Sequence, residues 1–109
     1  MSYAERWSPR PPDTAEVRAA LREIIDPDSG IDIVDLGLVY GVEITERAIR
    51  VRLTMTTPNS PLSGMIIDEV RTVLTYRFQR YRVDVALVWT PPWHPSMIAP
   101  LTRMELGLP

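Results

Sequence analysis

Apolar residues recur with the period of an α-helix in two stretches of the chain and with the period of a β-strand in three others. The first helical stretch carries apolar residues at i, i+3, i+4 and i+7, namely Val17, Ala20, Leu21 and Ile24. This spacing predicts a helix over residues 14–25. Asp13 and Glu16 have the spacing of a capping box at its start, and Pro27 ends it because the residue before a proline is pushed out of the helical region.

Two stretches with alternating apolar residues, 38–45 and 49–55, predict a β-hairpin with its turn at residues 45–47. In the second strand the odd-numbered positions are apolar and are expected to be buried: Ile49, Val51, Leu53 and Met55. Thr54 and Thr56 are therefore expected on the opposite, exposed face of this strand. Their hydroxyls could donate hydrogen bonds near the loop that follows, although threonine on an exposed strand face is common.

A second helix is expected from Pro61 to about Gln79, with an apolar stripe made of Leu62, Ile66, Val70, Val73 and Leu74. Ser60 suits the capping position and Pro61 the first helical position, where a proline leaves no N–H unpaired. A third strand over residues 83–89 follows. A strand, a helix and a strand in one small sheet form a right-handed crossover with the two strands parallel. We therefore predict an α/β (α+β) two-layer sandwich: a mixed three-to-four-stranded sheet with two helices on one face.

The ends of the chain are rich in proline. Residues 1–12 contain three prolines and no periodic apolar pattern, so they are expected to form a flexible tail before a single domain over residues 13–109. Trp7 is the one large apolar residue of that tail, and we favour packing on its own domain over packing on a partner. The segment 90–95 is too proline-rich for a helix or strand, and 100–107 contains a short amphipathic piece.

Composition limits the classes of function. The chain has 109 residues, of which 45% are hydrophobic and 24% charged, as expected for one soluble domain. A net charge of −2 gives no support to a nucleic-acid or anionic-membrane partner. No apolar run approaches 18 residues, so we expect a cytoplasmic location. The chain contains no cysteine, which excludes disulfides, thiolate nucleophiles and cysteine-ligated clusters within it.

The candidate chemistry lies around residues 54–64, where a strand ends and a helix begins. A helix N-terminus presents unpaired N–H groups and the positive end of the dipole, so Ser60 would face any anion or reactive group placed there. Asp26 is either a turn-forming residue that bonds nearby amides or a carboxylate that faces the Ser60 loop. Asp35 lies in an apolar segment and is expected to be partly buried, with its charge satisfied by backbone N–H groups. Gly37 after it is expected to supply a backbone conformation or a close approach that a side chain would prevent.

These residue types are those of an acyl-transfer site, with Ser60 as nucleophile, His94 as base and Asp26 or Asp35 orienting His94. The helix-capping role accounts for Ser60 without any chemistry, and no nucleophile-elbow motif surrounds it. His94 is the only histidine, and a metal site needs several convergent ligands, so we assign no metal. Trp93 beside it is expected to pack over the end of the sheet near the Ser60 loop.

Several motifs in order identify the chain as similar to a known family. They are Thr-Thr-Pro-x-x-Pro-Leu-x-Gly-Met-Ile at residues 56–66, Asp26-Pro27-Asp28, Ile33-Val34-Asp35-Leu36-Gly37-Leu38-Val39 and Pro91-Pro92-Trp93. Together they resemble the MIP18 or DUF59 family, which includes PaaD-like proteins and is linked to iron-sulfur cluster assembly. The resemblance runs from about Val17 to Gly107. Its members usually carry a reactive cysteine where this chain has Ser60.

The resemblance implies a set of family-site positions: Asp26, Asp35, Thr54, Thr57, Ser60, Pro61, Trp93 and Arg103. It implies that Asp26 lies near the reactive position, and Arg103 is expected to pair with a carboxylate.

Three functions stay open. The first is a non-enzymatic accessory of iron-sulfur cluster or metallocentre assembly, acting through protein contacts and with no cofactor on the isolated chain. The second is an accessory subunit of an oxygenase or biosynthetic enzyme, with the surface around Trp93 and Met97 as the contact. The third is a small enzyme that uses Ser60 and His94. We favour the first, with a protein client or partner enzyme, and leave a homodimer open.

Overall fold

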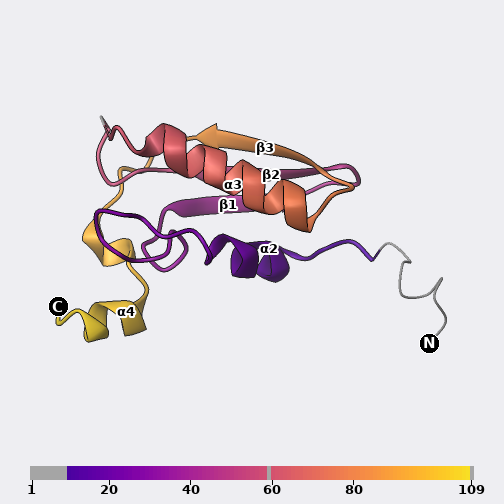
Figure 1. Cartoon of the computed structure of the whole chain (residues 1–109). Helices are drawn as coiled ribbons and strands as arrows, with labels where there is room; N and C mark the ends of the chain where they lie inside the picture. The colour runs from indigo at the N-terminus through magenta and orange to yellow at the C-terminus, as the bar shows by residue number, and fades with distance from the viewer. Residues whose placement is uncertain (1–9, 59, 109) are drawn as a thin grey trace.

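A mixed three-stranded sheet is the centre of the fold in the computed structural model, which describes residues 10–58 and 60–108 (Figure 1). Strand β1 (Val39–Ile44) pairs antiparallel with β2 (Ala48–Leu53), and β2 pairs parallel with β3 (Arg82–Leu87). The order is β1-β2-β3. The predicted hairpin and the predicted parallel pair around the second helix are both confirmed.

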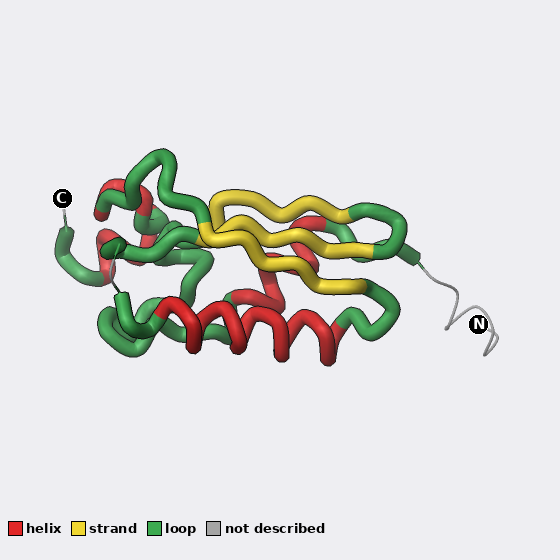
Figure 2. Tube along the Cα trace, turned by 90° about the horizontal axis from the view of Figure 1, so that it is seen from above, coloured by secondary structure: helices red, strands yellow, loops and turns green. Residues whose placement is uncertain are grey.

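Helix α2 (Thr14–Leu21) and helix α3 (Ser63–Arg77) cover one face of this sheet (Figures 1 and 2). Their apolar stripes meet the odd-numbered side chains of β2, which are buried as the alternation predicts. The residues with the largest fully buried side chains are Val17, Leu21, Ile24, Ile33, Leu36, Leu38, Ile49, Val51, Leu53, Ile66, Val70 and Leu74. The two-layer α+β architecture is therefore as predicted.

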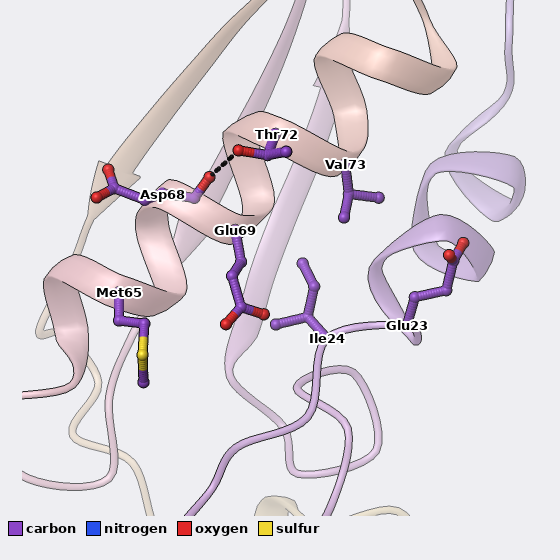
Figure 3. A pocket seen from close by; sticks show the side chains of 7 residues that line it. All are labelled: Glu23, Ile24, Met65, Asp68, Glu69, Thr72 and Val73. Carbon is purple, nitrogen blue, oxygen red and sulfur yellow. Dashed lines mark hydrogen bonds between the residues drawn. The ribbon is translucent and has the colours of Figure 1, made fainter.

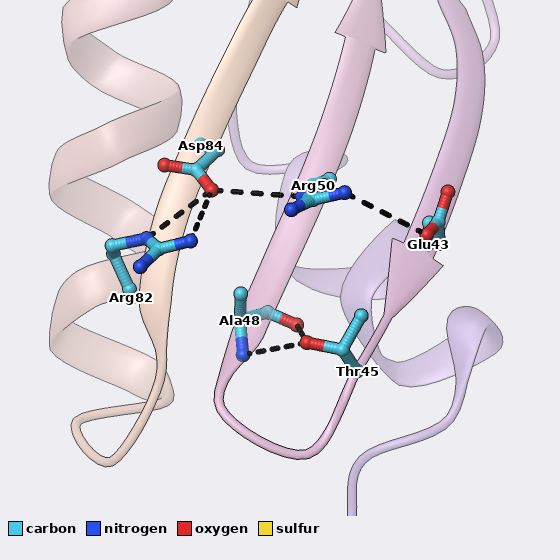
Figure 4. A network of polar contacts seen from close by, with 6 residues as sticks. All are labelled: Glu43, Thr45, Ala48, Arg50, Arg82 and Asp84. Atoms are coloured by element: carbon cyan, nitrogen blue, oxygen red, sulfur yellow. Dashed lines mark hydrogen bonds and ion pairs between the residues drawn. The ribbon is translucent and has the colours of Figure 1, made fainter.

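The opposite face of the sheet is open and carries a chain of ion pairs across all three strands (Figure 4). Arg50 on the central strand lies 4.0 Å from Glu43 on β1 and 3.7 Å from Asp84 on β3, and Arg82 lies 3.2 Å from Asp84. These side chains are about half exposed, so each pair contributes little, about 0–1 kcal/mol. These charged side chains nevertheless make the uncovered face of the sheet polar.

Helix α2 ends at Leu21, four residues earlier than predicted. Half of the predicted capping box is found at its N-terminus, where the Asp13 carboxylate accepts a hydrogen bond from Glu16 N at 2.7 Å. The Glu16 carboxylate pairs with Arg10 at 2.9 Å. After Arg22 the chain turns, which keeps Ile24 in the core and lets Ile25 form a bridge with Asp32. A continued helix would forfeit that pairing.

The two ends of the chain behave differently. At the N-terminal end of the described residues, Pro12 is buried and Arg10 is exposed. Trp7 and the rest of residues 1–9 lie outside the described residues. At the other end, a 3₁₀ helix η1 (Pro95–Met97) and helix α4 (Pro100–Glu105) follow the proline-rich segment. Leu101 and Met104 of α4 are each 74% exposed. None of the helices found in residues 10–58 and 60–108 has the length and apolar character to cross a membrane.

Candidate functional site

The C-terminal ends of β2 and β3 and the segments that follow them form one end of the molecule. Thr54 follows β2 directly, and its N–H donates to Leu38 O at 2.9 Å. Its side chain is 0% exposed, so the expectation that it lies on an exposed strand face is wrong. Backbone pairing continues past this end of β2 on both edges, because Thr54 N donates to Leu38 O and Val88 N donates to Leu53 O at 2.7 Å. Thr56 is exposed, as predicted.

The Thr54 hydroxyl is a buried polar group with no hydrogen-bond partner within the described part of the chain. A buried hydroxyl without a partner costs about 1–3 kcal/mol. The alternating pattern of β2 could not reveal this, because it continues unchanged from Arg52 to Thr54. Only the segments that pack over the strand end distinguish the two positions.

Ser60 does not cap α3 directly. The helix begins at Ser63 with Leu62 as its N-cap residue, and no side chain caps it. The Ser60 hydroxyl instead accepts a hydrogen bond from Leu62 N at 3.3 Å, and Ser60 O accepts one from Ser63 N at 3.4 Å. Ser60, Pro61 and Leu62 thus form a turn before the helix, and the predicted start at Pro61 is early by two residues. Ser60 is half-buried and Pro61 and Thr57 are exposed, so the turn stands at the surface.

Asp26 organises its own turn. Its side chain is only 7% exposed, and its carboxylate accepts from Ser29 N at 3.0 Å and from Ser29 Oγ at 2.8 Å. The Asp26 carbonyl accepts from Gly30 N at 2.8 Å. The turn-forming interpretation therefore holds. Among the described residues no hydrogen bond joins Asp26 to Ser60, so its approach to the Ser60 loop stays an implication of the resemblance.

Asp32, and not Asp35, satisfies the backbone of the next turn. Its carboxylate accepts from Val34 N at 3.0 Å and from Asp35 N at 2.9 Å. Asp35 is partly buried as predicted, but its carboxylate lies 3.5 Å from Arg22 Nε, so its expected role as acceptor of backbone N–H groups is wrong. Asp32 and Asp35 are both aspartates in the same apolar segment, so the sequence does not distinguish them. The path of the backbone in the turn decides which carboxylate faces the N–H groups of residues 34 and 35. Burial, helped by the neighbouring Asp35 carboxyl, raises the pKa of Asp32 above its ordinary value, against the lowering effect of the two N–H groups.

The segment 88–99 crosses this end of the sheet from β3 to the turn before β1. Three hydrogen bonds hold it: Tyr40 Oη donates to Pro91 O at 2.7 Å, Trp93 Nε1 donates to Leu36 O at 2.8 Å, and Ala99 N donates to Asp35 O at 2.7 Å. Ile98 is buried in the core. Met97 is partly buried, and its Sδ lies 3.5 Å from Tyr40 Oη. The Met97 sulfur, which was expected to belong to a partner contact, thus contacts Tyr40 within the fold.

Gly37 permits this crossing. Its φ is +85°, a left-handed conformation that favours glycine, and a Cβ at this position would lie 2.5 Å from Met97 O. Both reasons given for Gly37 from the sequence are therefore met at once.

A pocket of about 400 Å³ lies between the loop after β2 and the start of segment 88–99. It is lined by Met55, Thr56, Pro58, Trp89, Pro92 and Trp93, which we call the tryptophan pocket. Trp93 thus packs at the end of the sheet beside the loop that carries Ser60, where the sequence placed it. Its indole is fixed by the bond to Leu36, while Trp89 is exposed. Trp89 was not singled out from the sequence, where it reads only as the last residue of a strand.

His94 and Arg103 complete the predicted positions. His94 is exposed, and its Nδ1 accepts from Ser96 N at 3.0 Å, so it caps η1. Among the described residues no hydrogen bond or ion pair brings His94 to Ser60, Asp26 or Asp35. Arg103 is partly buried in α4, and its N–H donates to Ala99 O at 2.9 Å. Its pairing with a carboxylate stays a prediction.

The available donors do not fit a resident iron-sulfur cluster. Such clusters are held by cysteine thiolates, and the chain contains no cysteine. No group of three or more His, Cys, Asp or Glu residues in the described ranges is arranged to hold a metal ion.

Comparison with known proteins identifies the class to which this fold and site belong. A family model described as "Iron-sulfur cluster assembly protein" matches residues 14–88, and the chain belongs to this family. It is 40% identical over 86 residues to the Fe-S protein maturation auxiliary factor SufT of Staphylococcus aureus, covering 78% of this chain and 98% of that protein. It is 34% identical over 93 residues to the auxiliary factor YitW of Bacillus subtilis, covering 84% and 91%.

Solved structures agree with the family. A DUF59 domain of unknown function from Bacillus anthracis superimposes with a TM-score of 0.80 at 34% identity, over 87% of this chain and 92% of that one. A conserved hypothetical protein from Thermotoga maritima gives a TM-score of 0.75 at 36% identity, over 89% and 96%. The resemblance inferred from the motifs is confirmed.

Proposed function

We propose that this protein is a non-enzymatic accessory factor in iron-sulfur protein maturation, which acts by contacting a protein client and holds no cluster or metal of its own. One observation carries the proposal: the family match extends over most of the chain, yet the chain has no cysteine. The two relatives above are named as Fe-S protein maturation auxiliary factors. A protein of that family without cysteine can contribute a surface, but not a thiolate ligand.

The tryptophan pocket is the surface that we assign to this contact. Tryptophans are enriched in the residues that dominate binding energy at protein interfaces, because a large rigid ring fills a partner's pocket at little entropic cost. Here the Trp93 ring is fixed by its hydrogen bond, and Trp89 beside it is 41% exposed. Prolines on both sides, Pro58 and Pro92, add rigid apolar surface. The proposal places the protein in the cytoplasm and is compatible with either a monomer or a homodimer.

The other two functions gain less from the geometry. An enzyme that uses Ser60 and His94 needs the two side chains within hydrogen-bond reach, and His94 instead bonds to Ser96 in its own turn. Recruitment as an accessory subunit of an oxygenase would use the same pocket, and differs only in the identity of the partner. The experiment below separates these cases.

The test is affinity purification of the protein from its own host as wild type, Ser60→Ala, Ser60→Cys and Trp89→Ala, followed by metal and partner analysis. We expect the first three to recover the same iron-sulfur client or maturation protein, and Trp89→Ala to lose it. Arg47→Ala, at the far end of the sheet, is the matched surface control.

Three results would contradict the proposal. Iron bound to the wild-type chain would show a resident site. Loss of the partner, or capture of a small molecule, in Ser60→Ala alone would favour the enzyme. Recovery of an oxygenase or biosynthetic enzyme without any iron-sulfur protein would favour the accessory-subunit function.

A further inference from the structure

Besides the tryptophan pocket, the molecule has a groove on its helical layer, between helix α3 and the segment that follows α2 (Figure 3). Its volume is about 500 Å³. Its lining residues are Glu23, Ile24, Met65, Asp68, Glu69, Thr72 and Val73, and we call it the α3 groove. None of them lines the tryptophan pocket, so the two surfaces are distinct.

The α3 groove is negatively charged. It contains three carboxylates, of which Glu23 forms an ion pair with Arg77. Neither Asp68 nor Glu69 has a hydrogen bond or ion pair through its carboxylate within residues 10–58 and 60–108. Figure 3 shows the Glu69 side chain pointing into the groove beside Ile24, whereas the Asp68 carboxylate points away from Ile24. The groove therefore presents an unpaired negative charge directly next to buried apolar surface.

The exposed stripe of α3 extends this surface in both directions. Met65, Glu69, Thr72 and Tyr76 follow one another at i, i+4, i+7 and i+11, which places them along one face of the helix. Met65 is 44% exposed and Tyr76 is 75% exposed. Ile25, next to the groove residue Ile24, is 49% exposed. Large apolar side chains exposed together around a groove are typical of an interaction site, whereas single ones are not.

We infer that the α3 groove docks an amphipathic helix of a partner protein, one that carries arginine or lysine within a turn of its apolar residues. The apolar side chains would cover Met65 and Val73, and the cation would pair with Glu69. Docking of a helix into a groove through residues at i, i+3, i+4 and i+7 is a common mode of recognition. The unpaired Glu69 carboxylate selects a basic helix, because an acidic one would place like charges together. This inference does not depend on the iron-sulfur role or on the tryptophan pocket.

The test uses the full chain and two designed helical peptides. Both carry leucines at i, i+3, i+4 and i+7; one has arginines beside them, and in the other each arginine is replaced by glutamate. Amide chemical shifts of the ¹⁵N-labelled protein are followed during titration. We expect saturable shifts at residues 23–25 and 65–76 with the arginine peptide only, weakened by added salt.

Glu69→Arg is expected to weaken binding of the arginine peptide by about tenfold, since it converts an attraction into a repulsion. Glu46→Arg in the hairpin turn changes net charge equally and should leave binding unchanged. Both residues are exposed, so both variants should fold. Equal binding of the two peptides, no binding, shifts confined to the tryptophan pocket, or insensitivity to Glu69→Arg would each overturn the inference.

Discussion

Gly37 shows how one residue can join two segments that are distant in the sequence. Its backbone adopts φ +85°, and its missing side chain admits Met97 O from segment 88–99. Two other glycines separate these effects. Gly30 has φ +73° with nothing near a Cβ, and Gly64 in α3 has neither a positive φ nor a close neighbour.

Gly37→Ala is expected to lower the free energy of unfolding by about 2–4 kcal/mol, through left-handed strain and overlap together. Gly30→Ala should cost only the strain, about 1–2 kcal/mol. Gly64→Ala should be neutral or stabilising by up to about 1 kcal/mol, because alanine favours the helix. Chemical denaturation of the three variants measures the series. Equal losses at Gly37 and Gly30 would mean that the contact with Met97 is not maintained in solution.

Thr54→Val removes a buried hydroxyl that has no partner among the described residues and keeps the shape of the side chain. We expect the variant to be more stable by about 1 kcal/mol, since the desolvation cost of the hydroxyl disappears. Thr56→Val, at an exposed position two residues on, should change stability by less than about 0.5 kcal/mol. Thermal and urea unfolding give both values. A clear loss of stability in Thr54→Val would show that a bound water or ligand satisfies the hydroxyl.

Asp32 gives a pH dependence whose sign can be worked out. Its pKa is raised in the folded state, mainly by burial, so the folded chain binds this proton more tightly than the unfolded chain does. The stability from this group is therefore complete below the unfolded pKa and is lost as pH rises through the folded pKa. Asp32→Asn keeps an acceptor for the two amides and cannot ionise. Relative to wild type, the variant should gain stability from about pH 3.5 to pH 7; a difference that is constant with pH would contradict this.

At the scale of elements, the segment 88–99 matters more than its composition indicates. Its prolines correctly predict the absence of a strand at 90–95, but not that the segment crosses the sheet end and is held by Tyr40, Trp93 and Ala99. The limits of α2 and α3 were also missed by two to four residues. At the end of α2 the bridge of Ile25 to Asp32 prevailed over the helical pattern, and at the start of α3 the turn made by Ser60 took the place of the first helical residues.

Trp93→Phe tests the attachment of this segment. The change keeps an aromatic ring but leaves Leu36 O without its donor, and we expect a loss of about 1–2 kcal/mol. Trp89→Phe is the matched control, because no hydrogen bond of its indole contributes to the described structure and the ring is exposed. It should cost less than about 0.5 kcal/mol. Equal costs from urea denaturation of both variants would show that the indole N–H does not hold the segment.

At the scale of the molecule, two candidate contact surfaces lie on different layers of one small fold. The tryptophan pocket is at the sheet end. The α3 groove is on the helical layer (Figure 3). The open sheet face, by contrast, carries mutually paired charges from Glu43 to Arg82 (Figure 4). Pairing within a face leaves little charge for a partner, so we assign no contact there.

The proposal that this chain holds no metal of its own can be tested through its stability. We expect the melting temperature of the purified chain to be the same before and after dialysis against EDTA, because a bound metal would stabilise the fold by mass action. Ser60→Cys treated in the same way shows whether a restored thiolate makes the fold responsive to iron. A fall in melting temperature of the wild-type chain after EDTA would mean that a metal site exists which the donor chemistry does not predict.

The sequence by itself determined the three strands, the two long helices, the parallel pair and the family, since period, turn residues and ordered motifs are local properties of the chain. Tertiary structure alone decided which polar groups are buried. The β2 pattern is the same at Arg52 and Thr54, yet only Thr54 is covered. Asp32 and Asp35 fit the same motif, yet only Asp32 faces the amides. Both surfaces are likewise made by segments far apart in the sequence, so their shape and charge exist only once the chain has folded.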